Sequence, residues 1–236
     1  MSKKNNAPAL RLANTSRGLQ WGFQRGLQKS IVKSAGSLLG LCVLLIGVAA
    51  FVPQATAEQR VPKVLVEDFQ NLLLDVMRRA EDMTTRQRYD ALLPTVEQTF
   101  HLGLMTRFVT DGHWQDGTAE ERADMTKAFT RMNLATLATL FDGYSGQVFV
   151  TDGVESASQG RVLVKTRIVS PDGDFHSLTY VAKELSGRWW LIDVIVNNSI
   201  TELATRRSEY RSTLQAGGLP ALAGLLNSKA DSLLNP

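Results

Sequence analysis

The sequence predicts an α+β fold in which N-terminal helices, a four-stranded antiparallel sheet and two C-terminal helices follow one another. Apolar residues first recur at helical spacing, from about residue 61 to residue 141. The period then changes over residues 147–198, where four β-rich runs are separated by turn residues. Helical spacing returns after residue 198. We therefore expect helices from both ends of the chain to cover the sheet.

The N-terminal part of this fold contains several predicted helices. The first covers residues 61–82, where Pro62 suits a first turn. Residues 84–109 predict two short helices that meet near Pro94, and residues 110–117 predict a loop. Thr118 and Glu121 then form a capping box, which predicts the start of a long helix that reaches about residue 141.

The four β-rich runs cover residues 147–156, 160–170, 174–184 and 187–198, and they predict an antiparallel meander. The last run contains the stretch WWLIDVIV, in which strict alternation assigns Trp189, Leu191 and Ile195 to one face. The other face of this strand is equally apolar. Both faces must therefore be covered, one by the C-terminal helices and one by the N-terminal helices, across a dry core or a cavity.

The C-terminal part predicts two helices. Ser199 and Glu202 form a second predicted capping box, which begins the first of them. Gly217 and Gly218 are a stop signal for that helix, and Pro220 suits the first turn of the last one.

The N-terminus has the pattern of a secretory signal peptide. A basic region precedes the apolar run 35–52, and Ala55 and Ala57 have the small-x-small arrangement of a cleavage site. We expect cleavage after Ala57, so that residues 1–57 are the signal peptide and residues 58–236 form a single domain. An uncleaved inner-membrane anchor at residues 35–52 is the alternative, because 18 apolar residues are near the lower limit for a membrane span.

Charge and cysteine content exclude several classes of protein. The net charge is +3, but the first 57 residues hold seven of the 26 basic residues and no acidic one. The rest of the chain has 19 basic and 23 acidic residues, a net charge of −4, so no broad surface for nucleic acid is expected. The single cysteine, Cys42, lies in the leader, so the mature domain has no disulfide and no thiol chemistry. These features fit an exported, periplasmic protein.

Sequence motifs for catalysis, metals and cofactors are absent. The three histidines have no metal-like spacing, and neither a P-loop nor a GxGxxG motif occurs. Asp193 lies in the apolar strand and could act as a base if burial raised its pKa. We favour a structural role, in which Asp193 accepts hydrogen bonds near the start of the next helix. Arg207 and Arg211 share a helix face, which predicts either a solvated surface or contact with lipid headgroups or an acidic partner.

Four stretches carry a resemblance to a known family, namely LMTRFVTDGHWQDGTAEERADMTKAF, FDGYSGQVF, GRWWLIDV and SEYRSTLQAGGLPALAGLL. Together and in this order they resemble the MlaC or toluene-tolerance auxiliary proteins, which bind lipid in the periplasm. The resemblance covers the mature chain in order, and the segment SITELATRRSEYRSTLQAGGLPAL is more similar to the hopanoid-biosynthesis-associated branch (HpnM). The family positions that match are Trp189, Leu191, Asp193, Tyr210, Arg211, Gly217 and Gly218. Trp190 departs from the family, which often has a polar residue there.

The resemblance implies an NTF2-like or cystatin-like α+β fold that encloses an apolar pocket, with no enzymatic activity, metal or cofactor. It implies a periplasmic carrier that shuttles phospholipid or a hopanoid between an inner-membrane lipid transporter and an outer-membrane complex, with transient membrane contact. Arg207 and Arg211 are the expected headgroup or partner contacts. The expected lipid-contacting residues are Phe69, Leu73, Leu104, Phe108, Leu137, Phe141, Val148, Val150, Val162, Val164, Leu178, Tyr180, Trp189, Leu191 and Ile195.

Two other classes of protein remain compatible with these residues. One is a small cone-shaped α+β enzyme that uses Asp193 as a general base. The other is a structural periplasmic module whose apolar strand is plain core.

Overall fold

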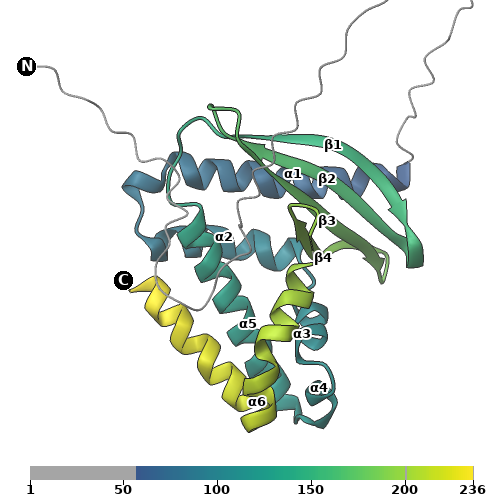
Figure 1. Ribbon diagram of the computed structural model, residues 1–236, viewed down its shortest axis with the longest axis vertical. Helices are drawn as coiled ribbons and strands as arrows, with labels where there is room; N and C mark the ends of the chain where they lie inside the picture. The colour runs from purple at the N-terminus through teal and green to yellow at the C-terminus, as the bar shows by residue number, and fades with distance from the viewer. Residues whose placement is uncertain (1–56, 200, 236) are drawn as a thin grey trace, which may run out of the picture. The chain divides into compact units, whose positions relative to one another are not determined.

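Helices flank a four-stranded sheet in the computed structural model, which describes residues 57–199 and 201–235 (Figure 1). The predicted leader lies outside the described residues, apart from Ala57 at its end. The described elements belong to one compact unit. In chain order they are α1 (Ala57–Arg78), η1 (Ala80–Asp82), α2 (Thr85–Thr99), α3 (Leu102–Thr110), α4 (His113–Asp116), α5 (Ala119–Leu140), β1 (Val148–Ala157), η2 (Ser158–Gly160), β2 (Arg161–Val169), β3 (Phe175–Leu185), β4 (Arg188–Val196) and α6 (Glu202–Leu234).

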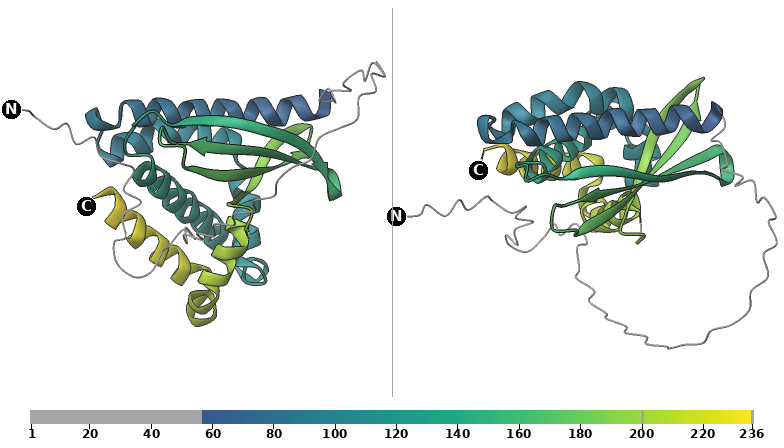
Figure 2. Two further views of the ribbon diagram at one scale, coloured as in Figure 1. Left: turned by 45° about the horizontal axis from the view of Figure 1, so that its top comes forward. Right: turned by 90° about the horizontal axis from the view of Figure 1, so that it is seen from above.

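The predicted fold class and the antiparallel meander are confirmed. The strands lie in the order β1-β2-β3-β4, and each pairs antiparallel with the next. Helix α1 runs along one face of this sheet (Figure 2). From α1, Gln70 Nε2 donates to Thr166 Oγ1 on β2 at 2.9 Å, and Glu67 accepts from Thr151 Oγ1 on β1 at 2.8 Å. The first part of α6 contacts β4, so helices from both ends of the chain meet the last strand, as predicted.

The boundaries of the N-terminal helices differ from the prediction. Helix α1 begins at Ala57, so Pro62 lies inside it rather than in its first turn. Pro94 likewise lies inside α2, and the chain leaves helical geometry only at Phe100 and His101. The cause is a tertiary contact, because Phe100 pairs with Leu191 of β4 and the His101 N–H donates to the Leu191 carbonyl at 2.9 Å. The predicted loop 110–117 contains the one-turn helix α4.

Capping residues position the two long helices. The predicted capping box of α5 is confirmed, with Thr118 Oγ1 accepting from Glu121 N at 3.1 Å and Glu121 accepting from Thr118 N at 2.7 Å. The prediction for α6 was wrong, because its N-cap is Thr201, whose hydroxyl accepts from Ala204 N at 3.1 Å. Asn197 and Asn198 both have φ 52°, which prolongs the turn after β4 and moves the helix start past Ser199.

The predicted stop within the C-terminal region is confirmed. Gly217 and Gly218 leave helical geometry inside α6, with φ −163°, ψ 23° and φ 63°, ψ −156° respectively. They divide α6 into two helical segments, as the sequence indicated. The segment after the two glycines lies beside α5 (Figure 1), where Arg131 forms an ion pair with Asp231 at 2.5 Å.

A β-bulge changes which residues of β4 share a face. Tyr180 of β3 pairs with Val194 and Val181 with Asp193, but the next residue, Ala182, pairs with Leu191. Ile192 is therefore an extra residue on β4. Leu191 consequently lies on the same face as Val194, toward α1, whereas Ile195 lies on the opposite face. The predicted common face of Trp189, Leu191 and Ile195 was wrong, because strict alternation does not anticipate a bulge.

Candidate functional site

Six of the predicted lipid-contacting residues form a closed core between α1 and the sheet. They are buried, and the ring of Phe69 meets those of Phe100 and Tyr180 edge-to-face at 5.1 and 6.3 Å between centroids. Burial raises the pKa of Tyr180 to about 12, although a hydrogen bond with Gln70 lowers it. The six residues are Phe69, Leu73, Val162, Val164, Tyr180 and Leu191.

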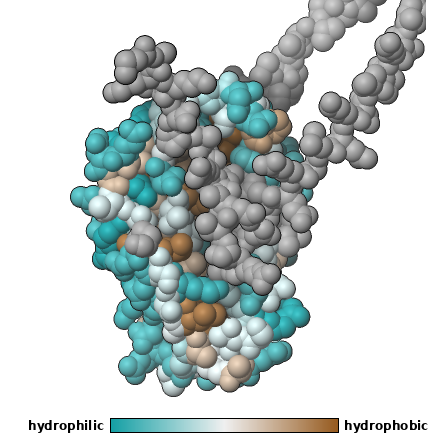
Figure 3. All heavy atoms as spheres, turned by 60° about the vertical axis from the view of Figure 1, so that its left-hand side comes forward, coloured by the Kyte–Doolittle hydropathy of each residue, from teal (hydrophilic) through white to brown (hydrophobic). Residues whose placement is uncertain are grey.

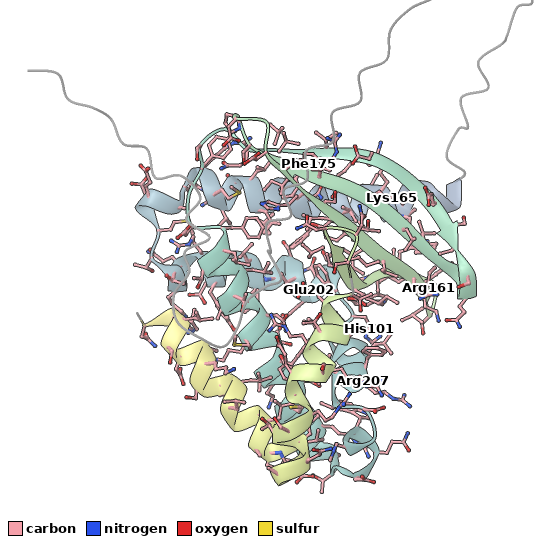
Figure 4. All side chains as sticks on the ribbon, viewed as in Figure 1. His101, Arg161, Lys165, Phe175, Glu202 and Arg207 are labelled. Carbon is pink, nitrogen blue, oxygen red and sulfur yellow. The ribbon has the colours of Figure 1, made fainter. Side chains whose placement is uncertain are left out.

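Three more predicted residues, Val148, Val150 and Ile195, lie on the sheet face that points away from α1. The register sets Val148 beside Val169 and Val169 beside Phe175. Val148 is 47% exposed and Phe175 is 52% exposed, so this row is an open apolar strip. In Figure 4, Phe175, Lys165 and Arg161 follow one another along the sheet.

The remaining predicted residues are spread over other elements. Phe108 is exposed on α3, beside Arg207. The other five are half-buried, namely Leu104, Leu137, Phe141, Leu178 and Trp189. The predicted residues thus lie on several different elements, and lipid contact by these residues stays a prediction. On the face in Figure 3, the visible described residues are mostly hydrophilic, with hydrophobic ones in separate places.

A cavity of about 560 Å³ lies where α2, α3, α5 and the start of β4 meet. Its volume is within the range of about 300–1,000 Å³ typical of small-molecule sites. Tyr89 and Phe100 are buried in its wall, whereas Glu97 and Lys127 in its lining are exposed to solvent. Its lining residues are Tyr89, Leu93, Glu97, Phe100, His101, Leu102, Gly103, Thr126, Lys127, Thr130, Arg131 and Trp190.

The pairing of Phe100 with β4 builds one wall of this cavity. It places His101 beside Trp190, with 5.2 Å between ring centroids, while the Arg188 guanidinium lies 4.0 Å from the centre of the Trp190 ring. His101 Nδ1 also accepts the N–H of Leu104 at 3.1 Å and so caps α3. Trp190 thus contacts both a cation and an imidazole. Trp190 is also the residue that departs from the family pattern. This departure is the sequence feature that could have indicated a cavity wall here.

Charged groups of both signs border the cavity. Lys127, whose side chain is 79% exposed, lies 3.4 Å from Asp124 on the same helix. The hydrogen bond that Arg131 makes with Asp231 raises the pKa of the Arg131 guanidinium. Burial raises the pKa of the Tyr89 hydroxyl. Glu97 takes part in no ion pair among the described residues.

Asp193 has the structural role that the sequence predicted. Its Oδ1 accepts from Val194 N at 2.8 Å and from Leu203 N at 3.2 Å, so it holds the first turn of α6 against β4. Burial raises the pKa of Asp193 despite these hydrogen bonds. Burial also raises the pKa of the neighbouring Glu202 to about 7. These carboxylates belong to the strand-to-helix corner and do not line the cavity.

The predicted contact residues Arg207 and Arg211 lie on the first segment of α6. Arg207 forms an ion pair with Asp111, and its guanidinium lies 5.6 Å from the centre of the Phe108 ring. Arg211 is exposed. Figure 4 shows Arg207 on the helical side of the molecule, well separated from Phe175 on the sheet. An exposed aromatic ring and two arginines therefore share one surface on α3 and α6.

Residues 57–199 and 201–235 contain no group of three or more His, Cys, Asp or Glu side chains placed to hold a metal ion. None of their helices is long and apolar enough to cross a membrane.

Comparisons with known proteins place the chain in a family. No curated protein matches it. Among solved structures it is similar to the phospholipid-binding protein from Ralstonia solanacearum, solved in complex with a phospholipid, with a TM-score of 0.65 and 14% identity over 73% of this chain and 98% of that one. The sequence model of the MlaC protein family matches residues 67–228, which include every strand and most of the helical residues described above. This chain belongs to the MlaC family.

Proposed function

We propose that this protein is a lipid carrier that holds a lipid tail in an apolar cavity and shuttles lipid between the inner and outer membranes. The observation that carries the proposal is the 560 Å³ cavity walled by Tyr89, Phe100 and Trp190, in a chain of the MlaC family. The similar protein from Ralstonia solanacearum, which was solved with a bound phospholipid, supports a lipid ligand.

The mechanism is partition rather than chemistry. Hydrocarbon exposed to water costs about 0.8 kcal/mol per CH₂ group, so ten exposed methylenes cost about 8 kcal/mol. An aromatic and aliphatic wall removes most of this free energy. Because Glu97 and Lys127 in the cavity lining are exposed to solvent, a headgroup can remain in water while a tail is inside. An open site of this kind also lets the lipid leave at the acceptor membrane.

Two classes of lipid fit the proposal. Phospholipid is supported by the ligand of the similar protein. A hopanoid is suggested by the resemblance of residues 199–222 to the HpnM branch of the family. Both would present hydrocarbon to the cavity, and the two differ in the charge of the headgroup.

An enzyme built on Asp193 is less well supported. The Asp193 Oδ1 atom accepts hydrogen bonds from two backbone amides, which gives this carboxylate a structural role at the start of α6, and Asp193 does not line the cavity. A structural module without a ligand would have no need for an open cavity with aromatic walls. We therefore favour a binding and transport function.

We further propose that the protein works in the periplasm, between an inner-membrane lipid transporter and an outer-membrane lipid complex. The signal-peptide pattern of residues 1–57 supports export and cleavage before Glu58. An uncleaved anchor at residues 35–52 would instead keep the domain at the inner membrane.

Protein purified from the cell envelope tests both parts of the proposal. N-terminal sequencing is expected to begin at Glu58, and organic extraction followed by mass spectrometry is expected to release phospholipid or hopanoid. A full-length, membrane-bound chain would contradict the cleavage. A lipid-free protein that also fails to acquire lipid from vesicles would contradict the carrier function.

The surface that carries Phe108, Arg207 and Arg211 is the proposed contact for membranes or partner proteins. Replacing both arginines with Glu is expected to slow the transfer of a fluorescent phospholipid between vesicles, because the surface loses its attraction for anionic headgroups. The free energy of unfolding should change by only about 1 kcal/mol, since the Arg207–Asp111 ion pair is on the surface. Lys63→Glu with Arg79→Glu makes the same charge change away from this surface and from the cavity lining, and it should leave transfer intact. Equal transfer rates for the two double variants would contradict the assignment.

A further inference from the structure

Two charges of opposite sign occupy different walls of the cavity without pairing with each other. Glu97 belongs to α2 and Lys127 to α5, and both side chains are exposed. The ion pairs among the described residues include none between them, and Glu97 appears in no ion pair at all. The partner of Lys127 is Asp124, three residues away on the same helix, in an exposed pair of the kind that contributes little.

Two more donors lie at or next to the cavity: His101 is in its lining, and Arg188 is outside the lining but against the ring of Trp190. Arg188 rests on Trp190 and donates to the backbone carbonyl of Gln98, so both of its contacts are uncharged. His101 Nδ1 accepts the N–H of Leu104, which leaves the other ring nitrogen to carry the proton and donate. Arg131, by contrast, is already neutralised by Asp231. Among the described residues at this site, the nitrogen donors without a strong carboxylate partner are therefore Lys127, Arg188 and His101, while Glu97 is the carboxylate acceptor.

We propose that this cavity selects a lipid whose headgroup carries both a phosphate and a primary ammonium group. This inference rests on the proposed function, since the tail lies against Tyr89, Phe100 and Trp190. The phosphate meets Lys127 and the donors beside Trp190, and the ammonium group meets Glu97. A headgroup with both charges can pair with Lys127 and with Glu97. A purely anionic headgroup leaves the charge of Glu97 unpaired and is repelled by it.

Single-chain phospholipids of equal tail length, used below their micellar concentrations, test the selection. Lysophosphatidylethanolamine is expected to bind about fivefold more tightly than lysophosphatidylglycerol, the upper end for one exposed ion pair. Lysophosphatidylcholine, whose methylated ammonium cannot donate a hydrogen bond, is expected to lie between them. The difference should shrink as ionic strength rises, because the charges are exposed. Tryptophan fluorescence or calorimetry gives the affinities.

Variants separate the two charges. Glu97→Gln should remove the preference for the ethanolamine lipid and leave binding of the glycerol lipid unchanged or slightly stronger. Lys127→Gln should weaken both lipids by up to about fivefold. Lys63→Gln is the matched control, because Lys63 is also an exposed helical lysine paired with a nearby acid and lies outside the cavity. It should change neither affinity.

Other outcomes overturn the inference at distinct points. If the three lipids bind with equal affinity and Glu97→Gln changes none of these affinities, the protein does not recognise the headgroup. The carrier function would still stand. Tight binding of phosphoethanolamine alone would make this a site for a free headgroup rather than a lipid. Binding of no single-chain lipid at all would remove the cavity assignment on which the inference rests.

Discussion

Replacing Gly103 with Phe is expected to remove most of the bound lipid while leaving the protein at least as stable. Gly103 lines the cavity in the first turn of α3, and a Cβ atom placed there meets no atom within 4 Å. The added ring can therefore occupy space that a lipid tail would use. Phe has a better helix propensity than Gly by a few tenths of a kcal/mol, so no loss of stability is expected. Extracted lipid per protein and the unfolding midpoint after delipidation are the two measurements.

Gly224→Phe is the matched control for this variant. Gly224 is an exposed helical glycine in α6 whose added Cβ also meets nothing within 4 Å, and it lies away from the cavity. It should retain the full lipid load. If Gly103→Phe also retains its lipid, the tail lies elsewhere, and the open strip of Val148, Val169 and Phe175 becomes the next place to test.

Gly218→Val is expected to lower the free energy of unfolding by about 3 kcal/mol. Gly218 has φ 63° and ψ −156°, a region that is essentially restricted to glycine and costs other residues about 1–3 kcal/mol, most for a β-branched side chain. At about 2–4 °C per kcal/mol for a domain of this size, the melting temperature should fall by roughly 6–12 °C. The cost is conformational, because a Cβ at Gly218 finds its nearest neighbour, Pro220 Cδ, at an ordinary 3.7 Å.

Gly224→Ala gives the opposite expectation on the same helix. Its backbone is helical and its surroundings are open, so alanine should stabilise the protein by about 0.5–1 kcal/mol. Urea or thermal unfolding of both variants checks the pair. A Gly218→Val protein as stable as the parent would mean that the two segments of α6 can rearrange freely at this point.

Local patterns predicted a large part of the fold correctly. Thr118 and Glu121 specify the start of α5 through contacts three residues apart, so no other part of the chain is needed. The double glycine at Gly217 and Gly218 interrupts α6 because its backbone adopts conformations that other residues disfavour. The meander followed from four β-rich runs joined by short turns. In each case the deciding interactions lie within a few residues.

Predictions failed where a distant segment decided the local structure. Pro94 is a local helix-breaking signal, yet α2 continues to Thr99 and breaks where Phe100 meets Leu191, 91 residues away. The bulge at Ile192 places Ile195 and Leu191 on opposite faces of the sheet. Only the pairing of β4 with β3 shows this bulge. Periodicity assumes unbroken alternation, so it assigned these residues to one face.

The sequence by itself determined the fold class, the strand order and the family, because these follow from periodicity, turn residues and ordered motifs along the chain. It also identified Trp190 as the unusual residue of its strand. Only the tertiary structure decided that six of the predicted lipid-contacting residues are buried between α1 and the sheet, and that the 560 Å³ cavity is walled by residues of α2, α3 and α5 with Trp190. The physical reason is that regularly spaced apolar residues indicate a buried face of a helix or strand. The same spacing occurs whether that face packs in a filled core or lines a cavity. The space itself exists only once Phe100 and His101 have joined the edge of β4.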